Sequence, residues 1–115
     1  MNLNQFFTRT MTDEYNCLDL ARDVWRELTG EDIADRLPKL QGRFSDRRIT
    51  LGGARTFQRL QTPVSPCICL MQRPGDQLHV GIYYNRRVIQ LTDTGVTNFP
   101  HAVATRHHPK VRWYK

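Results

Sequence analysis

Cys17 is the residue of this sequence best suited to nucleophilic chemistry. It follows Asn16, a good N-cap residue, at the expected start of a helix. Backbone N–H groups and the helix dipole at such a position stabilise an anion and can lower the pKa of a thiol. The alternative is a cysteine that only fills space, because most free cysteines behave as small buried hydrophobes.

His79 and Gln90 are the candidate partners of this thiol. A cysteine nucleophile needs a base that is close in space rather than in sequence, and His79 lies near the start of a predicted strand. A tight hairpin around residues 85–87 brings Gln90 near the level of His79, where its amide can orient the imidazole. The alternatives are a half-exposed histidine on an edge strand and a glutamine on the solvent face of a strand.

The apolar spacing predicts which elements hold these residues. Residues 16–29 are expected to form an amphipathic helix, with Asn16 and Asp19 in capping-box spacing and Gly30 as its terminator. Shorter helices are expected over 31–40 and 53–60.

From residue 67 the apolar period falls to two, which predicts strands over 67–72, 78–84, 88–92 and 111–114, with a loop from Gly95 to Pro100. Helices followed by an antiparallel meander predict an α+β fold, in which N-terminal helices pack on a C-terminal antiparallel sheet.

The composition predicts one domain over residues 1–115. Apolar residues make up 39% of the 115-residue chain, which is enough for one core. There is no apolar run of membrane-spanning length and no apolar signal-peptide segment, so we expect cytoplasmic synthesis without a signal peptide and no membrane span. The odd count of 3 cysteines argues against a disulfide framework. The Cys67-x-Cys69 spacing fits no zinc pattern, so no metal is expected.

The net charge of +6 favours an anionic partner without selecting one. Five arginines lie within residues 43–59. A basic nucleic-acid-binding domain is therefore one alternative function, although the sequence has neither helix-turn-helix spacing nor an aromatic RNA-binding motif.

Two local strings resemble the NlpC-type cell-wall cysteine peptidases, which are compact papain-like enzymes. One is Tyr15-Asn16-Cys17 followed by an amphipathic helix, and the other is the His-Val-Gly-Ile-Tyr string at 79–83, followed by a basic turn and Val-Ile-Gln at 88–90. The resemblance covers about 15–30 and 64–96 in the family's order.

This resemblance implies a papain-like, NlpC-type fold. It also implies that Cys17 is the nucleophile, His79 the base and Gln90 the orienting residue, and that Tyr15 helps to shape the oxyanion or substrate site. The implied function is a cysteine peptidase or amidase that hydrolyses peptide bonds in peptidoglycan stem peptides, without a cofactor. Expected partners are this substrate and phage-tail or delivery-system proteins, with the protein in a virion or delivered to the cell wall.

The residues after Cys17 depart from the family pattern. Asn16 stands where the family has Asp, and Leu18 and Asp19 stand where it has a small pair. The charge of Asp19 also opposes a thiolate one turn away. A catalytically inactive structural or assembly protein on the same fold is therefore the second alternative.

Overall fold

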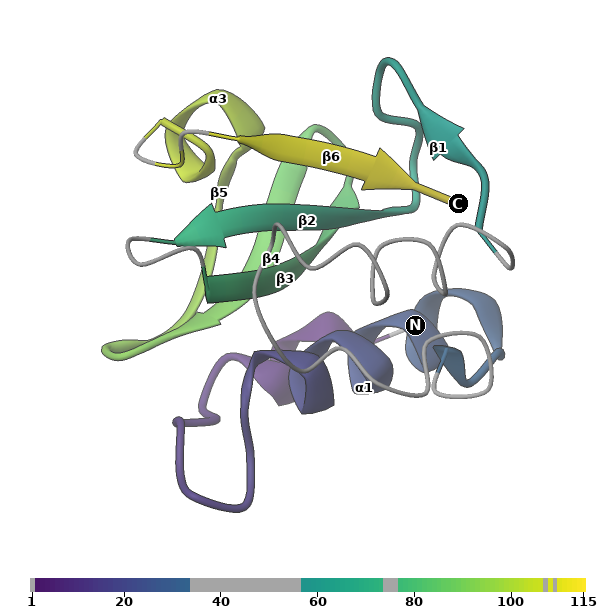
Figure 1. The fold of residues 1–115 in the computed structure, drawn as a ribbon. Coiled ribbons are helices and arrows are strands. Elements are labelled where there is room, and N and C mark those ends of the chain that lie inside the picture. The colour runs from purple at the N-terminus through teal and green to yellow at the C-terminus, as the bar shows by residue number, and fades with distance from the viewer. Residues whose placement is uncertain (1, 34–56, 74–76, 107, 109) are drawn as a thin grey trace.

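The computed structural model describes residues 2–33, 57–73, 77–106, 108 and 110–115, and its main element is a six-stranded sheet (Figure 1). Each neighbouring pair of strands is antiparallel, and the order across the sheet is β1-β6-β2-β3-β4-β5. The strands are β1 (Arg59–Leu60), β2 (Cys67–Arg73), β3 (Gln77–Tyr84), β4 (Arg87–Thr92), β5 (Gly95–Pro100) and β6 (Val111–Tyr114). The helices are the 3-10 turn η1 (Leu3–Phe6), the long helix α1 (Cys17–Thr29) and the short helix α3 (His101–Ala104).

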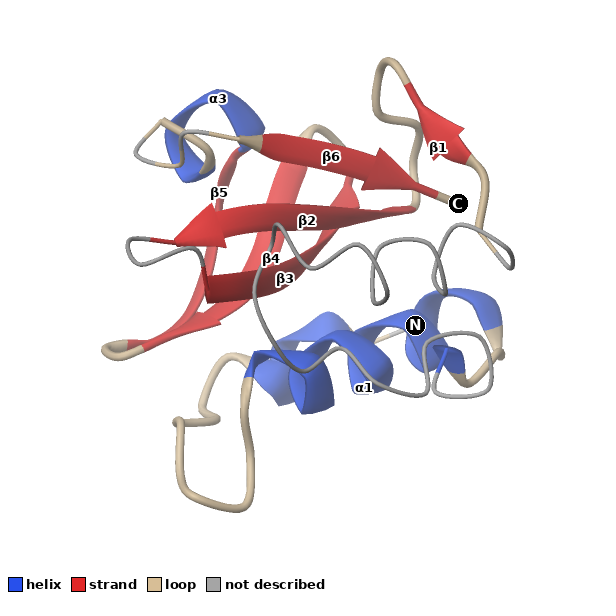
Figure 2. Ribbon diagram, viewed as in Figure 1, coloured by secondary structure: helices blue, strands red, loops and turns tan. Residues whose placement is uncertain are grey.

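The predicted α+β fold with N-terminal helices packed on a sheet is wrong. The papain-like, NlpC-type fold that the resemblance implied is wrong as well. In the described residues α1 is the only helix of seven or more residues, so the chain is a small mostly-β domain (Figure 2). Two segments account for part of the difference. Residues 95–100 pair with β4, and Arg59 and Leu60, expected in a helix, pair with β6. Strand pairing outweighs local propensity in both. Of the helices expected over 31–40 and 53–60, residues 31–32 and 57–58 are described and are not helical, whereas 34–40 and 53–56 lie outside the described residues.

Helix α1 and the central strands agree with the sequence pattern. The Asn16 side chain accepts hydrogen bonds from the backbone N–H groups of Leu18 and Asp19, and the Asp19 carboxylate accepts one from the Asn16 N–H. Gly30 ends the helix with a φ of 77°, the left-handed conformation that glycine adopts without strain. Between β3 and β4, Asn85 and Arg86 both have positive φ, as a two-residue hairpin turn requires.

The two faces of the sheet are covered differently. Helix α1 packs on one face, and α3 lies on the other side (Figure 1). We call the α1 face the helix side; its buried cluster comprises Phe6, Leu20, Ala21, Val24, Trp25, Ile33, Phe57, Ile68, Leu70, Val80, Ile82, Ile89, Leu91 and Tyr114. We call the opposite face the far side; its cluster comprises Cys67, Cys69, Met71, Tyr83, Val88 and Ala104.

Candidate active site

His79 and Gln90 form a buried hydrogen-bonded pair. His79 is the third residue of β3 and Gln90 the fourth of β4, and the His79 Nε2 lies 2.6 Å from the Gln90 Oε1. Their exposed fractions are only 1% and 6%. Because the amide oxygen accepts this bond, Nε2 carries the proton and the lone pair of the neutral ring lies on Nδ1.

Gly81 makes room for this pair. A Cβ at position 81 would lie 2.8 Å from Val88 Cγ1 and 3.3 Å from Gln90 Cβ, both closer than ordinary contact. A side chain there would also lie 3.1 Å from the Ile89 carbonyl oxygen, so it would press on β4, the strand that carries Gln90. Close packing against β4 therefore requires glycine at position 81 of the His-Val-Gly-Ile-Tyr string.

A second histidine covers the ring of His79. The His108 ring stacks on it, with centroids 6.0 Å apart and an interplanar angle of 12°. His108 is held in place by its Nδ1, which donates to the backbone carbonyl of Gln72 at 3.0 Å. The His79 Nδ1 is itself buried and has no hydrogen-bond partner among the described residues. A buried polar atom without a partner is costly, and such atoms often have a functional reason.

The surroundings keep His79 neutral. Burial is the main cause that lowers the pKa of His79 to about 4, and the positive charge of Arg73 and the neighbouring His108 lower it further. The hydrogen bond that His79 donates to Gln90 acts in the opposite direction and raises the pKa of His79. At neutral pH the Nδ1 atom is therefore an unprotonated base.

Cys17 is the first residue of α1, and it lies on the helix side of the sheet. It is half-buried and packs against the helix-side cluster. His79 belongs to the far side, because its register partner Met71 and the alternate residue Tyr83 are in the far-side cluster, whereas Val80 and Ile82 face α1.

The structure thus brings His79 and Gln90 together but does not bring Cys17 to them. Within the described residues no hydrogen bond joins Cys17 to His79. The two do share one end of the molecule, since α1 begins at the end of the sheet where β2 ends and β3 begins (Figure 1).

Tyr15 is tied to the segment before α1. Its hydroxyl accepts a hydrogen bond from Arg9 Nη1 at 2.6 Å and donates one to Asp23 Oδ2 at 2.8 Å. Burial is the main cause that raises the pKa of Tyr15 to about 12. Arg9 also forms an ion pair with Asp23. These contacts give Tyr15 a structural role, and its role at an oxyanion site stays a prediction.

Two other features bear on the expected site. Cys67 and Cys69 share the far side, and burial raises the pKa of both thiols, that of Cys67 to about 11. In the part of the chain that the structure describes, no group of three or more potential ligands could hold a metal ion. Sequence reasoning missed His108 as a neighbour of His79. No local pattern marks it, because its contact with His79 crosses from one loop to a distant strand.

The chain matches no protein-family model, no curated protein and no solved structure. Among the described residues there is no helix with the length and apolar character that crossing a membrane requires.

Proposed function

We propose that this protein is a cysteine hydrolase, a peptidase or amidase that acts on peptide bonds of peptidoglycan stem peptides. The observation that carries the proposal is the buried His79–Gln90 pair, in which Nε2 is hydrogen-bonded and Nδ1 has no partner in the part of the chain that the structure describes. A catalytic histidine needs one ring nitrogen fixed by an orienting group and the other free to take a proton. The resemblance of the 79–83 string to the NlpC-type peptidases gives the substrate class.

In this mechanism the His79 Nδ1 takes the proton of the Cys17 thiol as the sulfur attacks the substrate carbonyl carbon. The C–N bond then breaks, the imidazolium returns the proton to the leaving amine, and a thioester remains on Cys17. Water attacks the thioester while Nδ1 takes its proton, and that proton returns to the sulfur as the carboxylic acid leaves. Gln90 accepts the hydrogen bond from the His79 Nε2–H throughout. It therefore fixes Nδ1 as the nitrogen that takes and returns the proton.

The mechanism requires the Cys17 Sγ and the His79 Nδ1 to meet within hydrogen-bond reach. In the structure they lie on opposite faces of the sheet, at the same end of the molecule. The first turn of α1 and the start of β3 must therefore move relative to each other when substrate binds. Loops and element ends that complete a site only on ligand binding are a known device of enzymes.

An inactive structural or assembly protein is the second candidate, and a specific observation favours it. His79 is only 1% exposed and lies beneath His108, and Cys17 is not bonded to it. In this second candidate the His79–Gln90 pair serves only to fix the packing of the sheet.

Turnover of purified muropeptides, followed by mass spectrometry, separates the two candidates. Under the hydrolase proposal the wild type releases stem-peptide fragments, and Cys17→Ala and His79→Ala abolish release. Gln90→Ala has a smaller effect because Gln90 orients rather than reacts. Cys67→Ala is the matched thiol control and retains activity, since that thiol is buried and has a raised pKa. Circular dichroism checks that each variant folds.

The rate of Cys17 alkylation by iodoacetamide gives a second readout. If His79 activates the thiol, His79→Ala slows the labelling of Cys17 at neutral pH. No muropeptide turnover, together with a Cys17 labelling rate that is the same in wild type and His79→Ala, would establish the inactive candidate instead.

A further inference from the structure

Thr97, on the edge strand β5, carries a buried hydroxyl group next to the His79–Gln90 pair. Its Oγ1 is buried and has no hydrogen-bond partner among the described residues. Burial of a hydroxyl without a hydrogen bond is costly, so such a group in a folded protein needs an explanation. The position of Thr97 in the sheet identifies the Gln90 amide as the group that it can serve.

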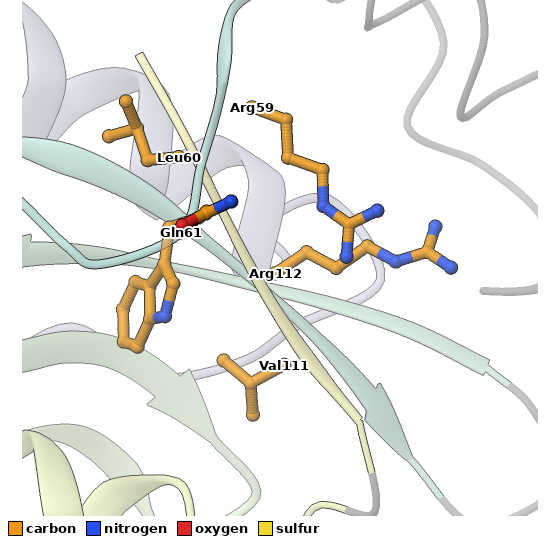
Figure 3. Close-up of a pocket in the computed structure, with 6 residues that line it drawn as sticks. Arg59, Leu60, Gln61, Val111 and Arg112 are labelled. Carbon is orange, nitrogen blue, oxygen red and sulfur yellow. The ribbon is translucent and has the colours of Figure 1, made fainter.

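Thr97 and Gln90 are direct neighbours on one face of the sheet. They are register partners of β5 and β4, and opposite side chains of an antiparallel pair share a face, with Cβ atoms about 5 Å apart. Successive residues of a strand point to opposite faces, as Val111 and Arg112 do on β6 (Figure 3). Because Ile89 belongs to the helix-side cluster, Gln90 and its partner Thr97 belong to the far side.

The Gln90 amide has a hydrogen-bond donor that lacks a partner. Its oxygen accepts the hydrogen bond from the His79 Nε2–H, and within the described residues Gln90 makes no other hydrogen bond. The NH2 group of Gln90 is therefore an unused donor beside the Thr97 Oγ1, which is an unused acceptor. A rotation of the Thr97 side chain about χ1, or one water molecule between the two groups, joins this donor to this acceptor.

We propose that Thr97 is a positioning residue for Gln90. Its hydroxyl accepts a hydrogen bond from the Gln90 NH2 group and so holds the amide oxygen against the His79 Nε2–H. Strand β5 is a firm support for this contact, since all 6 of its residues pair in register with β4. The effect of Thr97 on catalysis rests on the proposed hydrolase function, whereas its positioning of Gln90 does not.

Solvent exchange of the His79 Nε2–H proton, measured by NMR on the full-length chain, tests the proposal. Thr97→Val keeps the branched shape of the side chain and removes the hydroxyl. Exchange should become about five-fold faster or more, which corresponds to losing one neutral hydrogen bond that holds the amide. Thr97→Ser keeps a hydroxyl that can accept the bond, so exchange should stay within about two-fold of the wild type.

Two controls show whether the effect is local. Thr94→Val makes the same chemical change in the exposed β4–β5 turn and leaves exchange of the His79 proton unchanged. The backbone N–H groups of Ile82 and Ile89, which pair between β3 and β4, report general loosening of the sheet and should exchange as in the wild type. Unchanged exchange of the His79 proton in Thr97→Val, or equal acceleration at Ile82 and Ile89, would overturn the proposal.

Turnover of muropeptides by the same variants separates this proposal from the hydrolase proposal. Thr97→Val should lower kcat and leave KM unchanged, because Thr97 acts through Gln90 rather than on the substrate. Faster exchange of the His79 proton in Thr97→Val, with no turnover by the wild type, upholds the positioning role and rejects the hydrolase function. Turnover by the wild type, with exchange and kcat unchanged in Thr97→Val, rejects the positioning role alone.

Discussion

The two faces of the sheet bury side chains of different chemistry. The helix side buries aliphatic and aromatic groups, and α1 covers it with Leu20, Val24 and Trp25. The far side buries two thiols of raised pKa and, next to them, the His79–Gln90 pair. Both faces bury side chains, and the buried imidazole of His79 lies on the far side.

This difference separates the apolar groups that stabilise the fold from the polar groups that could take part in catalysis. Burial of the apolar helix side is favourable without any particular geometry, since the hydrophobic effect has no direction. Burial of an imidazole and an amide is tolerated only if they are hydrogen-bonded, and the His79 Nδ1 is not. Among the described residues the helix side also buries a polar atom without a partner, the Trp25 Nε1. His79 differs from Trp25 because its unpartnered nitrogen can accept a proton, whereas the indole N–H can only donate one.

The largest expected effect comes from the helix side. Trp25→Ala removes a side chain that is 2% exposed, and we expect a loss of about 3–5 kcal/mol in the free energy of unfolding, measured by urea denaturation. Trp113→Ala is the control from β6, where the side chain is only half-buried, so its loss should be clearly smaller. Equal losses would mean that the helix side does not dominate stability.

The pH dependence of stability tests the far side. The pKa of His79 is lowered from 6.5 to about 4, so the unfolded chain binds more protons than the folded chain between these values. The free energy of unfolding should therefore fall by about 3 kcal/mol as the pH drops from 6.5 to 4, with no further contribution from His79 below that window. Urea denaturation across this range measures the slope.

The double variant His79→Leu/Gln90→Leu isolates this slope from that of the carboxylates. The wild type and the double variant share every other titratable group. The difference between their pH dependences of unfolding free energy therefore comes from His79. A parallel pH dependence in the two proteins would show that His79 is not held neutral by burial.

The sequence predicted α1 and the central strands well, because each is specified locally. Asn16 and Gly30 mark the ends of α1, and the change from period 3.6 to period 2 marks β2, β3 and β4. Strands β5 and β1 were missed because pairing partners far along the chain decide them. The six antiparallel strands and one long helix of the described residues make a mostly-β domain. The fold class was mispredicted because the local sequence does not mark β1 and β5, which form only by pairing with other strands.

Of the candidate site, only the contact between His79 and Gln90 could be predicted from the sequence. Strands β3 and β4 are joined by a two-residue turn, so the meeting of His79 and Gln90 follows from local register. Whether Cys17 reaches them depends on which face α1 covers. The alternation of Val80 and Ile82 with His79 contained this information, since the apolar pair faces the helix and directs the histidine away from it.

Removing one partner of the buried pair should cost more than removing both. Gln90→Leu leaves the His79 Nε2–H unsatisfied, and we expect a loss of about 1–3 kcal/mol in the free energy of unfolding. His79→Leu/Gln90→Leu removes donor and acceptor together and should recover most of that loss in urea denaturation at neutral pH. If the double variant is less stable than Gln90→Leu, the pair is a stabilising element, and the contrast between the two faces is weaker than proposed.

The smallest expected effect is at the cap of α1, and it tests whether the two faces are coupled. Asn16→Ala removes the acceptor of the Leu18 and Asp19 N–H groups, so we expect a loss of about 1 kcal/mol in the free energy of unfolding. Asn16→Ser keeps a capping oxygen and should lose much less. Because the cap is on the helix side, the NMR-measured pKa of His79 should stay the same in both variants. A pKa change confined to Asn16→Ala would show that the first turn of α1 reaches the His79–Gln90 pair in solution, which is the approach that catalysis by Cys17 requires.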